Sequence, residues 1–493
     1  MNLSLLLEMA ASTLGDRPAV LSEGVVLSFG ALDAAARRVA GRIVEGGATG
    51  VVYCGTNDVS FPVALFAAAY AGVPFVPLNY RLGGEQLAPL VQANRGALVV
   101  ADGGAVAGAS PADVVDRERL LDPSFAPAGE VELPPFVDPD EVAIVLYTSG
   151  TSGTPKAALL RHRHLAAYVI GTVEFASADE GDAALVSVPP YHIAGIANLV
   201  SNVYAGRRIV YLAAFDPPVW LDTIRREGVS QAMVVPTMLA RVVAHLDGKP
   251  ADVPTLRTLS YGGARMPLPV LEQAIARFDG TGFVNAYGLT ETSSTIALLG
   301  PDDHAAAFAG DPVAKVRLGS VGRVLPGIEV EVRDEDGQVL PVGDPGLVFL
   351  RGEQISGEYD QGSVVDAAGW FATHDRGWVD ADGYLFIEGR ADDTIIRGGE
   401  NIAPAEIEDV LMRHDLVVDA VVVGVPDDEW GQRIAAAVVL ADGATVTADE
   451  LQAYCRAHLR GSKTPEIVDF RTELPRTPTG KLLRRTVVAD LTT

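Results

Sequence analysis

The chain has 493 residues, of which 48% are hydrophobic and 21% charged, and its formal net charge at pH 7 is −26. This length gives several domains with large cores, and the composition is that of a globular protein rather than a disordered one. The negative charge excludes a nucleic-acid surface, which needs clustered lysines and arginines. Two distant cysteines, Cys54 and Cys455, make neither a disulfide framework nor a metal site, which favours a reducing, cytoplasmic setting.

No targeting or membrane segment is expected. The first eleven residues are apolar but lack a basic start and carry Glu8, so they do not resemble a signal peptide. The uncharged run 61–78 is long enough to raise the question of a membrane span. Its three prolines and one glycine favour a buried helix that leads into a strand.

Apolar runs alternate with alanine-rich helical patterns in the first half of the chain. The expected strands are Val51–Cys54, Phe75–Leu78, Ala184–Val188, Arg208–Leu212 and Gln231–Val235, with helices near Val63–Ala71 and Glu85–Ala93. This alternation predicts mostly parallel sheets covered by helices. From about Val321 the pattern changes to short strands with glycine-rich turns, such as Glu329–Arg333, Gly346–Arg351 and Tyr384–Glu388, which predicts a β-rich subdomain.

The last hundred residues predict a separate small α/β module. Pro404 is placed to begin a helix, and Thr447 with Glu450 forms a capping box for another. The polar segment Ala391–Gly399 is the predicted boundary. We therefore expect an N-terminal domain over residues 1–391 and a C-terminal domain over residues 392–493.

The segment TSGTSGTPKA, residues 148–157, follows an apolar run that reads as a buried strand. Glycines let backbone N–H groups approach phosphate oxygens, hydroxyls donate further hydrogen bonds, and Lys156 adds a charge. The spacing differs from a Walker A loop, and Ala157 stands where that loop has its Mg²⁺-binding hydroxyl. The alternative is a solvated glycine and serine turn.

Other motifs are weaker when each is taken alone. In NAYGLTE, Tyr287 is placed to stack on a base, Thr290 to reach a phosphate and Glu291 to bind Mg²⁺, although an ordinary strand end is the simpler interpretation. Asp375 in THDRG offers an acceptor for a ribose diol, but it is equally expected to pair with Arg390 in GRADD.

Two further segments complete the set. SYGGA, residues 260–264, offers bare backbone for a flat ring, and the terminal PRTPTGK carries Lys481, which from position alone is expected to be solvated.

In this order the motifs resemble those of the adenylate-forming superfamily, which includes acyl-CoA synthetases, peptide-synthetase adenylation domains and luciferases. The matching segments are TSGTSGTPK, AYGLTE, THD, GRADD, GGENI and PRTPTGK, and the resemblance runs from about Leu27 to the C-terminus. Six motifs in register make coincidence negligible. The resemblance implies ATP, Mg²⁺ and CoA as ligands.

The resemblance also implies roles for individual residues. The loop over the β- and γ-phosphates would be Thr148, Ser149, Gly150, Thr151, Ser152, Gly153, Thr154 and Lys156. Adenine would lie between Gly263, Ala264 and Tyr287; Asp375 and Arg390 would hold the ribose; Thr290 would contact the α-phosphate; and Glu291 would bind Mg²⁺.

Four more positions follow from the same resemblance. Lys481 would bridge the acyl carboxylate and the α-phosphate, and Asp392 would be the hinge between the domains. Gly399 would lie beside the pantetheine tunnel. His192, in PPYHIAG, would guard the acyl pocket, with a satisfied structural histidine as the alternative.

Two residues depart from the usual motifs. Ala157 replaces a glycine after the loop lysine, which stiffens the loop without removing a ligand. His374 replaces a glycine before Asp375. It either alters that loop or places a titratable group near the ribose, and we favour the first interpretation.

The resemblance is greatest with the fatty-acyl and aryl-CoA ligase branch, through residues 76–87 and 397–408. A peptide-synthetase domain is normally followed by a carrier domain, whereas this chain ends thirteen residues after Gly480. The expected reaction joins a carboxylic acid to ATP as acyl-AMP and then to CoA, which places the enzyme in fatty-acid and lipid metabolism. Transfer to a carrier-protein thiol or an amine is one alternative, and a catalytically silent ligand-binding protein is another.

The acid itself is expected to be largely apolar. The segments 191–198, 236–239 and 293–298, which are expected to line its pocket, contain no lysine or arginine for a second carboxylate. Ile196, Ile296 and Ala297 are among the expected lining residues. The sequence leaves the chain length or aromatic character of the acid open, and also the oligomeric state.

Overall fold

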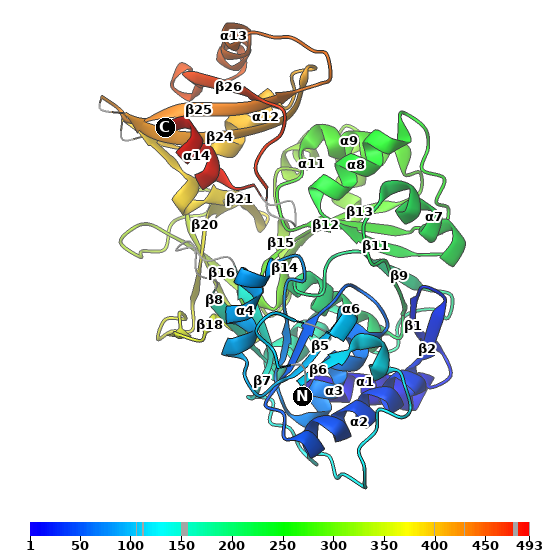
Figure 1. The fold of residues 1–493 in the computed structure, drawn as a ribbon. Helices are drawn as coiled ribbons and strands as arrows, with labels where there is room; N and C mark the ends of the chain where they lie inside the picture. The colour runs from blue at the N-terminus through cyan, green and yellow to red at the C-terminus, as the bar shows by residue number, and fades with distance from the viewer. Residues whose placement is uncertain are drawn as a thin grey trace.

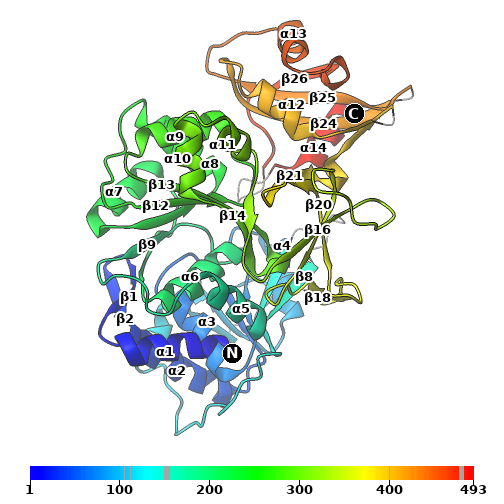
Figure 2. The same cartoon turned by 180° about the vertical axis from the view of Figure 1, so that it is seen from behind.

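The computed structural model describes residues 1–104, 106–110, 113–148, 156–398, 400–427, 429–476 and 482–492. These residues form a large N-terminal part and a small C-terminal part, drawn in orange and red in Figure 1. Figure 2 shows the same division from behind, and in both views the helices of the large part form two groups, one blue to cyan and one green.

One sheet is built mainly from the first third of the chain. Within the described residues it has eight strands in the order β19(Gly362–Ser363), β18(Glu358–Tyr359), β8(Lys156–Arg161), β7(Val142–Thr148), β4(Phe75–Pro77), β3(Val51–Cys54), β5(Leu98–Ala101) and β6(Val114–Asp116). The strands from β7 to β6 are parallel, as the alternation of strands and helices predicts, whereas β8, β18 and β19 pair antiparallel.

Helices cover both faces of this sheet. They are α1(Leu3–Leu14), α2(Phe29–Gly46), α3(Ser60–Ala71), α4(Gly84–Ala93) and α5(His162–Thr172). Alternation along β3 explains the two layers, because Val51 and Tyr53 join the core of α1, α2 and α3 whereas Val52 and Cys54 join that of α4. Every residue of α3 is buried, so the uncharged run 61–78 is a core helix followed by a strand. No helix in the described part of the chain is long and apolar enough to cross a membrane.

A second sheet spans the rest of the large part. Counting described residues only, its thirteen strands run in the order β16(Glu329–Arg333), β17(Gly346–Arg351), β20(Phe371–Val379), β21(Tyr384–Arg390), β15(Gly322–Val324), β14(Ser294–Leu299), β13(Gly282–Leu289), β12(Thr258–Gly262), β11(Gln231–Val234), β9(Ala183–Val186), β10(Arg208–Tyr211), β1(Pro18–Ser22) and β2(Val25–Ser28). From β1 to β13 the pairing is parallel, and from β13 to β16 it is antiparallel. The predicted β-rich subdomain is therefore continuous with the helix-covered sheet.

The helices associated with this second sheet are α6(Ile193–Ala205), α7(Pro217–Glu227), α8(Pro236–Leu246), α9(Leu268–Arg277), α10(Pro301–Phe308) and α11(Pro312–Arg317). Helices α7, α8 and α9 pack on the face that carries Ala232 and Val234 of β11. Short 3-10 helices are η1(Asp102–Gly104), η3(Arg117–Leu120), η4(Thr290–Thr292), η5(Ala391–Asp393) and η6(Gly461–Lys463).

The C-terminal part has its own core. A three-stranded sheet of β24(Val417–Asp427), β25(Gly431–Leu440) and β26(Ile467–Arg471) packs with α12(Pro404–Leu411), α13(Ala448–His458) and α14(Arg484–Thr492), beside the hairpin β22(Ile395–Arg397) and β23(Glu400–Ile402). The predicted capping box of Thr447 and Glu450 is present at the start of α13.

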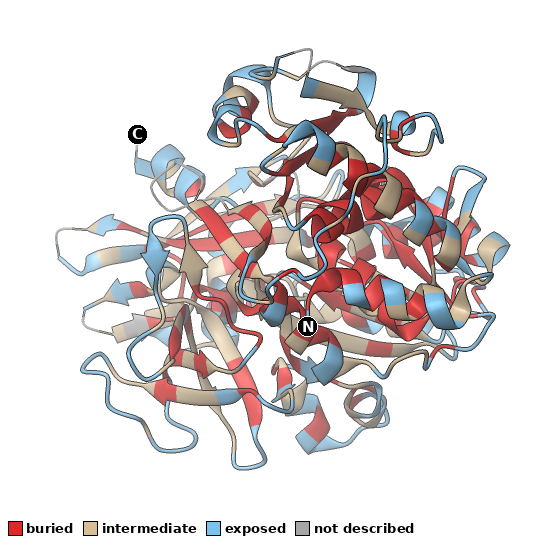
Figure 3. Cartoon of the chain, turned by 90° about the horizontal axis from the view of Figure 1, so that it is seen from below, coloured by how far each residue is buried: buried red, intermediate tan, exposed pale blue. Residues whose placement is uncertain are grey.

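Buried residues gather in the helices and strands at the centre of the molecule, whereas exposed residues lie on the loops and on parts of many helices and strands (Figure 3). Between the two parts, Arg265 forms an ion pair with Asp409 of α12, and α12 also contacts β21. The α/β fold class expected from the sequence is confirmed. The domain boundary between residues 391 and 392 stays a prediction.

Candidate active site

The phosphate-loop motif joins two paired strands. Thr148 ends β7 and Lys156 begins β8; the two residues are register partners, and the Thr148 hydroxyl donates to the Lys156 carbonyl at 3.4 Å. Residues 149–155, which include the other predicted phosphate contacts, lie outside the described part of the chain. The Lys156 Nζ lies 5.8 Å from the centre of the Tyr359 ring.

Tyr359 joins the loop lysine to Glu291. Strand β18 pairs with β8 through Tyr359 and Ala158, and the Tyr359 hydroxyl donates to Glu291 Oε1. Burial and the Glu291 carboxylate raise the pKa of Tyr359, so this hydroxyl stays protonated and remains a donor. The sequence analysis missed Tyr359, because only the pairing of β18 with β8, which are far apart in the chain, places it here.

The turn that carries Thr290 and Glu291 is strained. Ser293 and Ser294, which follow directly, have φ of 55° and 110°, where non-glycine residues are uncommon. The Thr292 hydroxyl accepts from the Leu289 N–H at 2.9 Å, and the Gln354 side chain donates to the Thr292 carbonyl at 2.9 Å. Strain held in place by surrounding hydrogen bonds is typical of functional sites.

Gly288 in this motif has no room for a side chain. A Cβ added there would lie 1.9 Å from the Ser294 carbonyl oxygen on β14. We expect Gly288→Ala to lower the free energy of unfolding by about 3 kcal/mol, because the obstacle is backbone and cannot turn aside. Chemical denaturation measures this change. The control is Gly46→Ala at the end of α2, where nothing lies within 4 Å; we expect that variant to be about 0.5–1 kcal/mol more stable. Equal stability of the two variants would contradict the steric argument.

Asp375 lies at the centre of a second group. The Tyr287 hydroxyl donates to Asp375 Oδ2, and Arg390 Nε lies 3.3 Å from Asp375 Oδ1 across paired strands β20 and β21. Arg390 also donates to the Thr373 carbonyl at 2.6 Å. Burial and the Asp375 charge raise the pKa of Tyr287. The pairing of Asp375 with Arg390, expected as one alternative, is therefore present, and their contact with a ribose stays a prediction.

His374 keeps a backbone conformation that favours glycine. Its φ is 59°, within an irregular stretch of β20 opposite β17, and its side chain is exposed. A left-handed φ costs a non-glycine residue about 1–2 kcal/mol. This backbone explains why the motif usually has glycine before the aspartate.

The glycine pair lies next to Tyr287. Gly262, at the end of β12, is the register partner of Ala286 on β13, and a Cβ on Gly262 would meet the Ala286 carbonyl at 2.3 Å. Gly263 has φ of +80°, and both Gly263 and Ala264 are exposed. Because β12 and β13 are parallel, their carboxyl ends share one edge, so the bare backbone and the Tyr287 ring lie close together.

His192 occupies the N-cap position of α6. Its Nε2 is buried and has no hydrogen-bond partner among the described residues, and its ring centre lies 4.7 Å from that of Tyr191. Burial, with a smaller effect of Arg81, lowers the pKa of His192 to about 4, so the ring is neutral at pH 7. The role of His192, at an acyl pocket or in the structure alone, stays a prediction.

Three of the expected acyl-pocket residues are core residues instead. Ile196, Ile296 and Ala297 have no exposed surface. Ile196 packs with α1 and α3, and Ile296 and Ala297 pack with the buried residues of β17. Ile193, Ala194 and Met238 keep partial exposure, so they remain candidates for the predicted acyl pocket.

The predicted hinge and its neighbours lie between the two parts of the chain. Asp392 is exposed in η5, and the next residue, Asp393, forms an ion pair of 3.4 Å with Arg484 at the start of α14. Lys481 and Gly399 fall outside the described residues.

The described residues contain no cluster of three or more metal-binding side chains. A single carboxylate such as Glu291 still suits Mg²⁺, which is commonly held by one or two carboxylates together with substrate phosphates and water.

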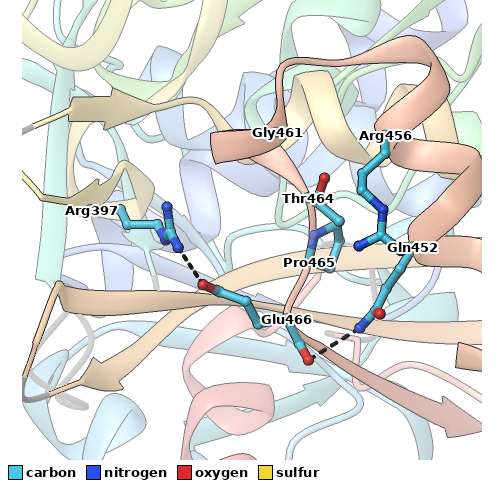
Figure 4. Close-up of a pocket in the computed structure, with 7 residues that line it drawn as sticks. All are labelled: Arg397, Gln452, Arg456, Gly461, Thr464, Pro465 and Glu466. Carbon is cyan, nitrogen blue, oxygen red and sulfur yellow. Dashed lines mark hydrogen bonds and ion pairs between the residues drawn. The ribbon is translucent and has the colours of Figure 1, made fainter. Parts of the chain in front are cut away.

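A cavity of about 290 Å³ opens in the C-terminal part (Figure 4). Its lining is polar and comprises Arg397, Gln452, Arg456, Gly461, Thr464, Pro465 and Glu466. Arg397 pairs with Glu466 and lies 4.9 Å from the centre of the Trp430 ring, and Gly398 donates to the Trp430 carbonyl at 2.8 Å. No partner of the Arg456 guanidinium is found within the described residues. Arg456 therefore supplies the cavity with a positive charge that no described carboxylate pairs with.

Comparison with known proteins shows similarity over nearly the whole chain. The AMP-binding enzyme family matches residues 7–360, and the AMP-binding enzyme C-terminal domain matches residues 406–481. A fatty acid–[acyl-carrier-protein] ligase, ScoC of Streptomyces coeruleorubidus, is 35% identical over 491 residues, which cover 95% of this chain and 92% of that protein.

Two other similar proteins are named for acids other than fatty acids. A feruloyl-CoA synthase from an Amycolatopsis species is 34% identical over 94% of each chain. The structure of o-succinylbenzoate CoA synthetase from Bacillus subtilis, in complex with its acyl-adenylate intermediate, matches with a TM-score of 0.84 and 29% identity, over 98% of this chain and 97% of that one.

Proposed function

The chain belongs to the AMP-binding enzyme family, in its acyl- and aryl-CoA ligase branch, and from this membership we propose that it activates an apolar carboxylic acid, fatty or aryl, with ATP and transfers it to CoA. The products are acyl-CoA, AMP and pyrophosphate. The observation that carries the proposal is the grouping of motif residues from distant segments: Tyr359 contacts both Lys156 and Glu291, and Tyr287 contacts Asp375 beside Arg390.

In the first step a carboxylate oxygen attacks the α-phosphorus, the bond to the bridging oxygen breaks, and pyrophosphate leaves. Two anions must come together, so positive charge and positioning matter more than proton transfer. Lys481 is proposed to lie between the carboxylate and the α-phosphate, Thr290 to donate to that phosphate, and Lys156 to meet the β- and γ-phosphates. Glu291 would hold Mg²⁺, which neutralises phosphate charge when bound.

Tyr359 is proposed to orient the Glu291 carboxylate. Its hydroxyl occupies Oε1, which fixes the side chain and leaves Oε2 for a cation. The Tyr287 hydroxyl fixes the Asp375 carboxylate in a similar way. Adenine would lie between Tyr287 and the backbone of Gly263 and Ala264.

In the second step the CoA thiolate attacks the acyl carbon and AMP leaves. Lys481 would obstruct this approach, which is why we propose that residues 392–493 rotate as a body about Asp392 and bring Gly399 beside the pantetheine chain. The N-terminal body would be residues 1–391. The exposed 3-10 turn η5 supports this hinge position, because its side chains are not fixed in a core.

The acid is proposed to be apolar because the partly exposed residues near His192 are Ile193 and Ala194, and His192 itself is neutral. An unpaired second carboxylate there would cost several kcal/mol, whereas each buried CH₂ stabilises binding by about 0.8 kcal/mol. We place the enzyme in the cytoplasm, where its two buried, unpaired cysteines would stay reduced.

The relatives differ in the acceptor of the acyl group, since ScoC is a ligase for an acyl carrier protein whereas the feruloyl relative is a CoA synthase. CoA carries a diphosphate and a 3′-phosphate, which a carrier's phosphopantetheine lacks. The Arg456 guanidinium in the cavity offers charge for such phosphates, and this favours CoA over a carrier or an amine.

We expect Arg456→Glu to raise the KM for CoA about tenfold, the effect of losing roughly 1.4 kcal/mol of binding energy. Pyrophosphate release in the absence of CoA should not change, because Arg456 is not among the residues proposed to contact ATP or the acid. Steady-state thioester formation over a range of CoA concentrations measures the effect. Arg413→Glu, an exposed residue of the same part outside the cavity, is the matched control. An unchanged KM for CoA, or equal effects of both variants, would remove this cavity from the CoA site.

Pyrophosphate release over a panel of carboxylic acids tests the proposed function, followed by mass spectrometry of the products with CoA, a holo carrier protein and amines. We expect release that depends on a monocarboxylic acid and an acyl-CoA product. Failure of every acid to release pyrophosphate would instead indicate a silent ligand-binding homologue. A preference for malonate or acetate would overturn the apolar acid but not the adenylation.

A further inference from the structure

Helix α6 carries a chain of polar side chains that leads away from the predicted active site. Arg207, just past the end of the helix, donates from Nη1 to Asn202 Oδ1 at 2.8 Å. Asn202 donates from Nδ2 to the Asn198 backbone carbonyl at 2.7 Å and to Asn198 Oδ1 at 3.0 Å, and Asn198 donates from Nδ2 to the Met233 sulfur at 3.4 Å. Asn198 lies one helical turn after Ala194, on the same face of α6.

The chemistry of arginine fixes the direction of this chain. A guanidinium has only donors, so Asn202 must turn its carbonyl oxygen toward Arg207 and its amide nitrogen toward Asn198. The Asn198 oxygen is then occupied, and its NH₂ group must be the free end. Hydrogen bonds that run in one direction from a cation polarise one another. The Asn198 NH₂ group is therefore a strengthened donor. The position of Arg207 fixes which end of this amide is nitrogen, so its nitrogen and oxygen cannot be interchanged.

The acceptor at this end is poor. A thioether sulfur accepts only weakly, and it is the one acceptor that Asn198 Nδ2 has within the described part of the chain. An amide donor prefers an oxygen acceptor, so the partly exposed Asn198 NH₂ group keeps the capacity for a further hydrogen bond.

The surroundings also point to a binding surface. Asn198 and Met233 both keep partial exposure, whereas their sequence neighbours Ala197, Leu199, Ala232 and Val234 are buried. Met233 lies on the face of β11 opposite the α7, α8 and α9 layer. The Asn198 amide thus lies between α6 and the second sheet. It is on the same face of α6 as Ala194, which is close to His192 in the chain.

We propose that Asn198 is a specificity-determining residue of the acyl site, whose amide donates to an oxygen acceptor on the body of an otherwise apolar acid. The substrate class is then an oxygenated acid, with an ether, hydroxyl or keto oxygen, rather than a plain hydrocarbon acid. This inference rests on the proposed function. A neutral oxygen fits better than a carboxylate, because one neutral amide does not offset the burial of a charge.

The test compares pairs of acids that differ by one atom. In each pair a CH₂ group of a medium-chain alkanoic or substituted cinnamic acid is replaced by an ether oxygen, at successive positions, and pyrophosphate release gives kcat/KM. For the wild-type enzyme we expect a preference of about tenfold for oxygen at one position, the scale of one well-placed hydrogen bond. Asn198→Leu, which keeps the branched shape of the side chain and removes the donor, should abolish or reverse this preference while the hydrocarbon acids still react.

Ser201→Ala is the matched control, since Ser201 lies on the same helix outside the chain of amides. We expect it to leave the oxygen preference unchanged. The wild-type comparison needs no variant, so the proposal stays testable if Asn198→Leu fails to fold.

Three results would overturn the proposal while the proposed function stands: no preferred oxygen position in the wild type, a preference that survives Asn198→Leu, or a dicarboxylic acid preferred over every ether. Absence of pyrophosphate release with all acids would overturn both.

Discussion

Lys481→Ala is expected to lower the rate of acyl-AMP formation by about 10²–10³-fold, the scale for removing one preorganised charge from a transition state. The lysine is placed by the motif PRTPTGK, since residues 477–481 are outside the described part of the chain. Its charge would offset the repulsion between the acyl carboxylate and the α-phosphate. Glu291 and Tyr359 do not replace it, because one is an anion and the other is neutral.

The measurement separates the two half-reactions. Single-turnover pyrophosphate release reports adenylation, and thioester formation from supplied acyl-AMP and CoA reports transfer. We expect the second rate to change little in Lys481→Ala. Lys249→Ala, at an exposed position after α8, is the control and should leave both rates unchanged. Equal losses in the two half-reactions would show that Lys481 does not act in adenylation alone.

Local patterns in the sequence predicted several of the elements. The strand Val51–Cys54 has the bounds expected from its apolar run, and the capping box of Thr447 and Glu450 begins α13. Such elements depend on residues close in the chain. The contact between Asp375 and Arg390 was also an open alternative, because both residues stand in recognisable motifs.

Contacts across the fold could not be predicted in this way. Tyr359 reaches Glu291 only because β18 pairs with β8, and no local signal marks that pairing. The continuity of the β-rich region with the helix-covered sheet depends likewise on the pairing of β13 with β14.

For the predicted acyl pocket, the sequence did not show which residues of α6 are buried. Apolar composition was correct for the segment around Ile196, but composition does not tell which face of α6 is buried. Ile196 therefore lies in the core, whereas Ala194 and Asn198 keep exposed surface. The sequence did not predict the direction of the hydrogen bonds from Arg207 to the amides of α6, because that direction depends on where Arg207 lies after the helix.

Asp392→Pro is expected to leave pyrophosphate release near normal and to abolish most acyl-CoA formation. Proline fixes φ near −65°, which is compatible with the 3-10 conformation of η5 but prevents rotation about that bond. The backbone N–H that proline removes lies in the first turn, where an N–H has no hydrogen-bond acceptor within the helix. Helix α7 of this chain has prolines at its first two positions, so the local geometry is tolerated.

The matched control is Asp392→Ala, which removes the same carboxylate and keeps the backbone free. We expect Asp392→Ala to support both half-reactions at nearly wild-type rates, and both variants to unfold at similar temperatures because position 392 is exposed. If proline slowed only the transfer step, the rotation of residues 392–493 would be required for CoA to reach the acyl carbon. Normal acyl-CoA production by Asp392→Pro would mean that transfer proceeds without rotation at this residue, and the hinge would have to be placed elsewhere.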